Sequence, residues 1–110
     1  MSRAREDKEW IRLGSVAEIP EEEIRSYELG EARVAVANLD GRLYAFEDEC
    51  THQDCLLSEG SVTEEETVVC PEDGSVFDMN TGEPTAGPAE EPIRVFAIRV
   101  QMDWVEVDIR

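Results

Sequence analysis

Four side chains of the types that bind transition metals stand in two short segments of the sequence. Cys50 and His52 are separated by one residue, and Cys70 and Asp73 follow after seventeen further residues. Thiolate sulfur, imidazole nitrogen and carboxylate oxygen are all ligands for iron. Two thiolates on one iron, with nitrogen and oxygen ligands on a second, is the arrangement of a [2Fe–2S] centre with mixed ligation. The spacing therefore predicts a metal centre built from two loops.

The cysteine count favours metal or redox chemistry over a disulfide framework. The chain has three cysteines, Cys50, Cys55 and Cys70, which cannot all pair within one chain. The first residues are charged, no apolar signal segment follows them, and no window is long enough to span a bilayer. We therefore expect the protein to lie in the cytoplasm, where thiols stay reduced.

The length and charge of the chain narrow the classes of function. One hundred and ten residues give room for one domain, and 10 Lys+Arg against 27 Asp+Glu give a net charge of −17. That charge repels phosphate backbones and anionic lipids, so nucleic acid and membranes are excluded as expected partners. The hydrophobic fraction of 41% is too high for a disordered acidic tail.

The pattern of apolar residues predicts an all-β domain, either a barrel or a sandwich. We expect a flexible N-terminal segment over residues 1–9 and the domain over residues 10–110. Asp40-Gly41 is a strong signal for a two-residue hairpin turn, whereas the prolines and glycines after residue 83 predict an extended irregular segment. The expected strands cover residues 10–13, 24–29, 33–39, 43–46, 67–69, 75–77, 93–100 and 104–109.

The segments around the four potential ligands resemble the Rieske-type ferredoxins and the Rieske domains of ring-hydroxylating oxygenase systems. The pattern of that family is C-x-H, a spacer of roughly fifteen or more residues, and C-x-x-H. The resemblance extends over residues 10–109 and includes Leu57-Ser58-Glu59-Gly60, Gly74-Ser75-Val76-Phe77-Asp78, Thr81-Gly82-Glu83-Pro84 and Gly87-Pro88-Ala89. It implies stacked antiparallel sheets, two cluster-binding loops at one tip, and a proline-containing loop near Pro88 that covers the cluster.

One position departs from the family pattern. Asp73 stands where the family has its second histidine, and His52 is the only histidine of the chain. The family histidines bind iron through Nδ1, which is bonded to Cγ, and an aspartate Oδ is bonded to Cγ in the same way. We therefore expect Cys50 and Cys70 on one iron, and His52 and Asp73 on the other.

A carboxylate ligand changes the charge of the redox centre. A +2 oxidised core with two thiolates is neutral when its other ligands are imidazoles, and carries −1 when one of them is a carboxylate. A unit charge a few Å away is worth roughly 4 kcal/mol, on the order of 0.1–0.2 V for one electron. We expect a reduction potential toward or below the bottom of the Rieske range, with one titrating histidine, His52, as the exit for electrons.

Three residues at or near the expected ligands can each be interpreted in two ways. Asp73 is either a ligand or a sign that the fold persists without a cluster, as in the small subunit of assimilatory nitrite reductases. Cys55 is either a buried thiol lining the loop or a third thiolate in a three-Cys, one-His set. Ser75 is either a hydrogen-bond donor to the cluster sulfurs or a plain turn serine. We place Cys55, Gly74, Ser75 and Pro88 around the ligands rather than among them.

These observations predict an electron-transfer protein rather than an enzyme. The sequence has no flavin or nicotinamide fingerprint and no nucleophile paired with a base. The resemblance implies a monomeric ferredoxin that passes single electrons from a flavin-dependent reductase to a terminal oxygenase. The acidic surface predicts basic docking patches on both partners. The alternative is a cluster-free interaction subunit of a larger reductase.

Overall fold

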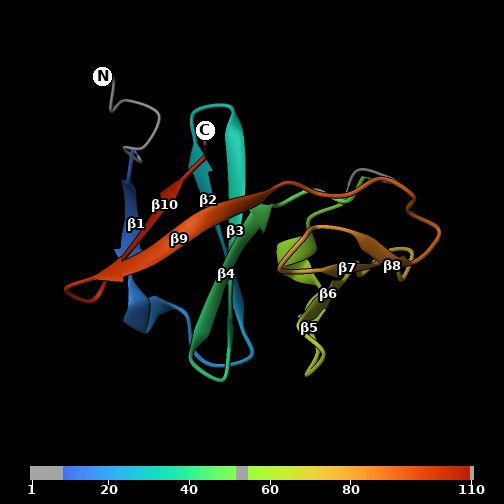
Figure 1. The fold of residues 1–110 in the computed structure, drawn as a ribbon, viewed down its shortest axis with the longest axis horizontal. Coiled ribbons are helices and arrows are strands. Elements are labelled where there is room, and N and C mark those ends of the chain that lie inside the picture. Colours follow the sequence, from blue (N-terminus) through green and yellow to red (C-terminus); the bar gives the residue numbers. More distant parts are fainter. Residues whose placement is uncertain (1–8, 52–54, 110) are drawn as a thin grey trace, which may run out of the picture.

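The computed structural model describes residues 9–51 and 55–109, which fold into ten strands joined by turns and loops (Figure 1). The strands are β1 (Ile11–Ser15), β2 (Ile24–Leu29), β3 (Ala32–Leu39), β4 (Arg42–Glu47), β5 (Ser61–Val62), β6 (Thr67–Val69), β7 (Val76–Asp78), β8 (Pro84–Ala86), β9 (Val95–Gln101) and β10 (Trp104–Asp108). Two 3₁₀ turns, Val16–Glu18 and Leu57–Glu59, are the helical segments of the described residues. Neither is long and apolar enough to cross a membrane.

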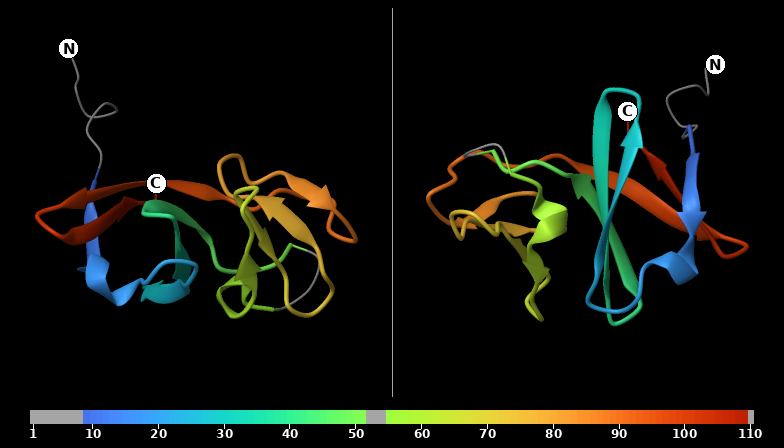
Figure 2. Two further views of the ribbon diagram at one scale, coloured as in Figure 1. Left: turned by 90° about the horizontal axis from the view of Figure 1, so that it is seen from below. Right: turned by 180° about the vertical axis from the view of Figure 1, so that it is seen from behind.

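The strands form two antiparallel sheets of different size. The larger has the order β1-β10-β9-β4-β3-β2, and the smaller has the order β5-β6-β7-β8. Figure 2 shows the small sheet standing to one side of the strongly curved large one. The expectation of an all-β fold with stacked antiparallel sheets is confirmed.

Strand β3 is buried on both faces over its central residues, which explains the apolar run Val34-Ala35-Val36-Ala37. Its alternate residues join two separate cores. Val34 and Val36 pack inside the curve of the large sheet with Val105 and Val107, whereas Ala35 and Ala37 face the small sheet. The second core contains Phe46, Leu57, Phe77 and Met79, together with Cys50 and Cys70. The side chains of the expected metal site are therefore continuous with the core between the sheets.

The β3–β4 hairpin turns where the sequence predicts. Asp40 and Gly41 both have positive φ, +54° and +90°. Two successive positive values are required by the type I′ turn, whose twist matches that of the flanking strands. This turn fixes the pairing of Leu39 with Arg42 and of Ala35 with Phe46.

The small sheet and its loops form one continuous segment, residues 48–93, between β4 and β9. We call this segment the excursion. These two strands are neighbours in the large sheet, with Ala45 opposite Phe96 and Phe46 opposite Val95. Glu47 N–H donates to the carbonyl oxygen of Arg94 at 2.8 Å, which closes the base of the excursion. Figure 1 shows the chain leaving at the end of β4 and returning at the start of β9. Both ends of the site-bearing unit are thus held by the large sheet.

Some strand boundaries differ from the sequence prediction. The segment after residue 83, expected to be irregular, contains β8, which pairs with β7 through Val76–Ala86 and Phe77–Pro84. Its proline is tolerated because β8 is an edge strand of the small sheet. The strand expected at 75–77 begins one residue later, and the short strand β5 was not expected. Most of the expected flexible segment 1–9 lies outside the described residues, which begin at residue 9.

Candidate metal centre

The first loop leaves β4 and ends at the 3₁₀ turn Leu57–Glu59. Asp48, 1% exposed, begins this loop, and its carboxylate accepts hydrogen bonds from the N–H and the hydroxyl of Ser58, both at 2.7 Å. These bonds between Asp48 and Ser58 close the loop, and we call them the Asp48–Ser58 closure. Within the closed loop, Cys50 N–H donates to the carbonyl oxygen of Cys55 at 3.1 Å. These bonds bring the two cysteines of the loop to the same side. The predicted ligand His52 lies outside the described residues.

The second loop connects β6 to β7 and presents Cys70. Cys70 N–H donates to the carbonyl oxygen of Ser75 at 2.7 Å, and Gly74 N–H donates back to the Cys70 carbonyl at 3.1 Å. Gly74 has a φ of +78°, a conformation that residues with a Cβ rarely adopt. This tight turn places the side chains of Cys70 and Asp73 on the inner side of the loop.

A third segment, residues 87–91, closes against both loops. The hydroxyl oxygen of Ser75, which is fully buried, accepts a hydrogen bond from Ala89 N–H at 3.0 Å. Thr51 Oγ1 donates to the carbonyl oxygen of Glu91 at 2.7 Å. Pro88, expected to cover the cluster, is exposed, and the buried residue of the segment is Ala89. Sequence reasoning missed Asp48 and Thr51, whose roles depend on contacts between distant loops.

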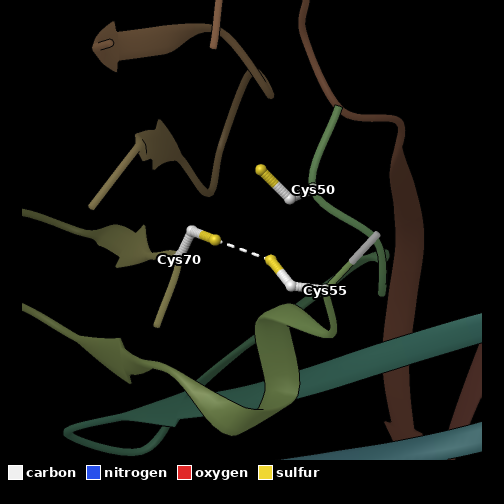
Figure 3. A group of neighbouring side chains, drawn as sticks. All are labelled: Cys50, Cys55 and Cys70. Carbon is white, nitrogen blue, oxygen red and sulfur yellow. Dashed lines mark hydrogen bonds between the residues drawn. The ribbon is translucent and has the colours of Figure 1, made fainter. Parts of the chain in front are cut away.

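Three sulfur atoms converge where the loops meet. The Sγ atoms of Cys50, Cys55 and Cys70 all lie within 4.8 Å of one another (Figure 3). Cys50 and Cys70 are buried, and Cys55, expected to be a buried thiol, is partly exposed. The Sγ atoms of Cys55 and Cys70 are 2.6 Å apart. The two predicted thiolate ligands are therefore together, and the Cys55 sulfur lies within 4.8 Å of both.

Asp73 lies at the same junction. The Cys50 thiol donates a long hydrogen bond to Asp73 Oδ2, with a sulfur–oxygen distance of 3.9 Å. The other carboxylate oxygen, Oδ1, accepts from Ser75 N–H at 2.9 Å. This second bond fixes the orientation of the carboxylate, as is usual for carboxylates that bind metals. Three of the four predicted ligands, Cys50, Cys70 and Asp73, thus come together in the described part of the chain.

Burial makes the thiols of Cys55 and Cys70 weaker acids than a free thiol. Loss of hydration raises the pKa of Cys55, and the contact with Cys70 raises it further. Burial likewise raises the pKa of Cys70, although hydrogen bonds to that sulfur partly oppose the effect. Thiols of this kind stay protonated at neutral pH, and a bound metal ion displaces their protons.

The excursion that carries the site is strongly acidic. Residues 48–93 contain 13 Asp+Glu and no Lys or Arg. Exposed glutamates flank each of the three converging segments: Glu49, Glu72, Glu90 and Glu91. The excursion therefore has a net charge of −13, which is most of the chain's net charge of −17.

An open groove of about 440 Å³ runs beside the first loop. Its lining includes Cys55 and Leu56 from the loop, Arg33 and Phe96 from the large sheet, and Arg94 just before β9. Cys55, which is partly exposed, therefore borders the groove, whereas the other two cysteines are buried.

Comparison with known proteins identifies the family. Residues 9–97 match the family described as the Rieske [2Fe-2S] domain. This chain belongs to the Rieske [2Fe–2S] family. It is 38% identical over 101 residues to the anthranilate 1,2-dioxygenase ferredoxin subunit of Burkholderia cepacia, with 92% of this chain and 93% of the relative covered. The family resemblance of the sequence is thus confirmed.

Solved structures agree with this assignment of the Rieske fold. A chain of the complex of reduced oxygenase and oxidized ferredoxin in carbazole 1,9a-dioxygenase matches with a TM-score of 0.83 and 31% identity, covering 93% of this chain and 94% of that one. The putative NADH-dependent nitrite reductase small subunit from Mycobacterium tuberculosis matches with a TM-score of 0.82. Its identity is 18%, with 92% of this chain and 95% of that one covered, so it shares the fold alone.

The family match and the similarity to ferredoxin subunits together give the cofactor and the class of activity. The cofactor is a [2Fe–2S] cluster, and the protein is an electron carrier rather than an enzyme. The described residues fit such a group, because two buried thiols meet at the junction of two short loops beside an oriented carboxylate.

Proposed function

We propose that this Rieske protein is the ferredoxin component of a ring-hydroxylating oxygenase system. It receives single electrons from a flavin-dependent reductase and delivers them to a terminal oxygenase. The ligands are Cys50 and Cys70 on one iron, and His52 and Asp73 on the other. When bound, the [2Fe–2S] cluster supplies the ability to accept and release one electron.

The observation that carries the ligand proposal is the meeting of Cys50, Cys70 and Asp73. The two sulfurs come from different loops, and the carboxylate of Asp73 reaches the Cys50 sulfur at 3.9 Å. A carboxylate held by Ser75 N–H is oriented before any metal arrives. This arrangement supports Asp73 as the replacement for the family's second histidine.

The surrounding residues hold the loops and limit the access of water. The Asp48–Ser58 closure fixes the first loop, and the bond from Ala89 N–H to Ser75 holds the third segment over the second loop. Cys50 is 4% exposed and Cys70 is 1% exposed. A dry environment around the ligands strengthens the effect of each nearby charge on the reduction potential.

The charge around the site supports the proposed partners. The tip carries exposed glutamates on all three segments and no Lys or Arg over residues 48–93. A potential of one sign around a redox site steers association with a partner of the opposite sign. Basic patches on the reductase and the oxygenase fit this surface, and the chain acts in the cytoplasm as a monomer.

The direct test is cluster content in the wild type and in Asp73→Ala. Anaerobically prepared wild-type protein should be reddish-brown, contain about two irons per chain and give a rhombic EPR spectrum when reduced. Asp73→Ala should lose most of its iron. The matched control is Asp103→Asn, which changes an exposed aspartate in the β9–β10 turn and should retain the full iron content.

Electron transfer is tested with a flavin reductase and a terminal oxygenase of the same class as purified partners. Wild-type protein should support product formation that is absent when it is omitted. A colourless, iron-free wild-type protein would contradict the proposal and favour the cluster-free interaction subunit. Asp73→Ala with unchanged iron and an unchanged spectrum would show that the ligand assignment is wrong.

A further inference from the structure

The three thiols have the spacing of a site for one metal ion. In a tetrahedral zinc site with Zn–S bonds of about 2.3 Å, neighbouring sulfurs are about 3.8 Å apart. The Sγ atoms of Cys50, Cys55 and Cys70 all lie within 4.8 Å of one another. Cys55 and Cys70 are closer than this, at 2.6 Å, so the Cys55 sulfur must move by roughly 1 Å to share an ion. Cys55 is partly exposed and borders the open groove, so it is less constrained by packing than the two buried cysteines.

Asp73 offers a fourth donor beside one of the three sulfurs, that of Cys50. Its Oδ2 is 3.9 Å from the Cys50 sulfur, and a Zn–O bond of about 2.1 Å predicts a sulfur–oxygen distance of about 3.6 Å in a tetrahedral site. The hydrogen bond from Ser75 N–H to Oδ1 holds the carboxylate in this orientation. The three sulfurs alone lie within 4.8 Å of one another, so the Asp73 carboxylate must shift toward Cys55 and Cys70 to complete the four-coordinate site that zinc prefers.

Access and charge also favour a divalent cation. The excursion around the site contains 13 Asp+Glu and no Lys or Arg, so its field attracts positive ions. Cys55 is partly exposed and borders the groove, so this side of the site is more accessible than the two buried cysteines.

We propose that Cys50, Cys55, Cys70 and Asp73 bind a single divalent transition-metal ion, of which zinc is the best fit, when the chain has no cluster. Binding displaces the thiol protons and draws Cys55 into the metal site. The ion-bound chain is a form separate from the electron carrier, since Cys50 and Cys70 cannot hold the ion and the cluster together. Zinc therefore competes with cluster insertion.

The test uses the full-length, cluster-free chain in a metal-free reductant, with Co²⁺ as a spectroscopic probe and Zn²⁺ as competitor. Wild-type protein should bind one Co²⁺, with tetrahedral ligand-field bands and a thiolate-to-cobalt charge-transfer band of three-sulfur intensity. Cys55→Ala should reduce that intensity by about one third and weaken Zn²⁺ binding more than 100-fold, because even outer partners of a zinc site are worth about 10–100-fold. Thermal unfolding checks that the variant is folded.

Cluster loading of the same variant separates this proposal from the electron-carrier proposal. Cys55→Ala should take up a normal [2Fe–2S] cluster while losing the zinc site, since Cys55 is not among the proposed cluster ligands. Full-strength charge-transfer absorption in Cys55→Ala would overturn the proposal. So would a Cys55–Cys70 disulfide that persists in reductant and excludes Co²⁺. Asp73→Asn with wild-type zinc affinity, beside the control Asp103→Asn, would overturn the assignment of the fourth ligand.

Discussion

Asp48 holds Ser58 by two hydrogen bonds, one from the backbone N–H and one from the hydroxyl, each 2.7 Å long. The two residues bracket the first ligand loop, and the carboxylate is almost completely buried. This pair therefore sets the separation of the loop's ends and indirectly the position of Cys50.

Asp48→Ala should destabilise the protein and loosen the first loop. Hydrogen bonds to a charged group are worth roughly 1.5–3 kcal/mol, and the variant leaves Ser58 N–H without its partner. We expect the free energy of unfolding in urea to fall by about 2–4 kcal/mol, with faster iron loss to a chelator. Ser58→Ala, which removes only the hydroxyl bond, should show a smaller loss. Equal stability of Asp48→Ala and wild type would contradict this role.

Asp73→His should make the reduction potential more positive. The change replaces a proposed anionic ligand by a neutral imidazole, which removes one negative charge from the site. At an effective dielectric constant near 20, that charge is worth on the order of 0.1–0.2 V. Protein-film voltammetry over a range of pH measures the shift and should reveal a second titrating histidine. A potential equal to that of the wild type would mean that residue 73 does not bind iron.

Ser75→Ala should affect both stability and potential. The buried N–H of Ala89 would lose its acceptor, at a cost of roughly 1–3 kcal/mol in the free energy of unfolding. The Ser75 hydroxyl also carries a proton that it can donate to the site, so its loss should lower the reduction potential. The control Ser26→Ala, at an exposed position of β2, should change neither quantity. Loss of stability with an unchanged potential would assign Ser75 a structural role only.

Glu106 should contribute to acid sensitivity far from the metal site. Its carboxylate binds Arg99 and Arg12, at 2.8 and 3.1 Å, and these contacts, chiefly the hydrogen bond from Arg99, lower its pKa. A lowered pKa in the folded state gives stability that is complete above the ordinary glutamate pKa, about 4.3. That stability disappears as the pH falls through the lowered folded value.

The variant Glu106→Gln should therefore be less stable than wild type at pH 7, and the difference should shrink in acid below about pH 4. Urea unfolding at several pH values measures it. Glu28→Gln, which removes an exposed partner of Arg33, should change the unfolding free energy by no more than about 0.5 kcal/mol. A stability difference that does not vary with pH would contradict the ion-pair explanation.

Electron transfer to a basic partner should depend on salt and on the acidic tip. Raising the ionic strength above about 0.1 M shortens the Debye length below about 10 Å and should slow association. Stopped-flow rates for Glu90→Gln/Glu91→Gln should be lower than those for the control Glu21→Gln/Glu22→Gln, two exposed residues in the turn before β2. Equal rates for the two double variants would place docking elsewhere.

The sequence predicts the large sheet better than the small one. The β3–β4 hairpin follows from Asp40-Gly41 and the long apolar run before it, which are local signals. Strand β8 does not, because Pro84 signals a break and its pairing with Phe77 depends on a neighbouring strand. The three-residue strands of the small sheet carry too little alternation to define their ends.

At the site, residue types are readable from the sequence but distances are not. Cys50 and Cys70 follow from the family pattern, and Asp73 from its place in that pattern. The nearness of Cys55 to Cys70 depends on how two separate loops fold against each other, which no local pattern encodes. The Asp48–Ser58 closure is similar, since it joins residues ten positions apart across a loop.

Glu47 and Arg94, which flank the excursion, are hydrogen-bonded neighbours, so the two ends of the excursion lie side by side and it can be exchanged as one unit. A segment with adjacent ends can be replaced by the equivalent segment of a relative, or made longer or shorter, without changing the order of the strands in the large sheet. Evolution can therefore change the reduction potential of the site in the excursion while the large sheet stays the same.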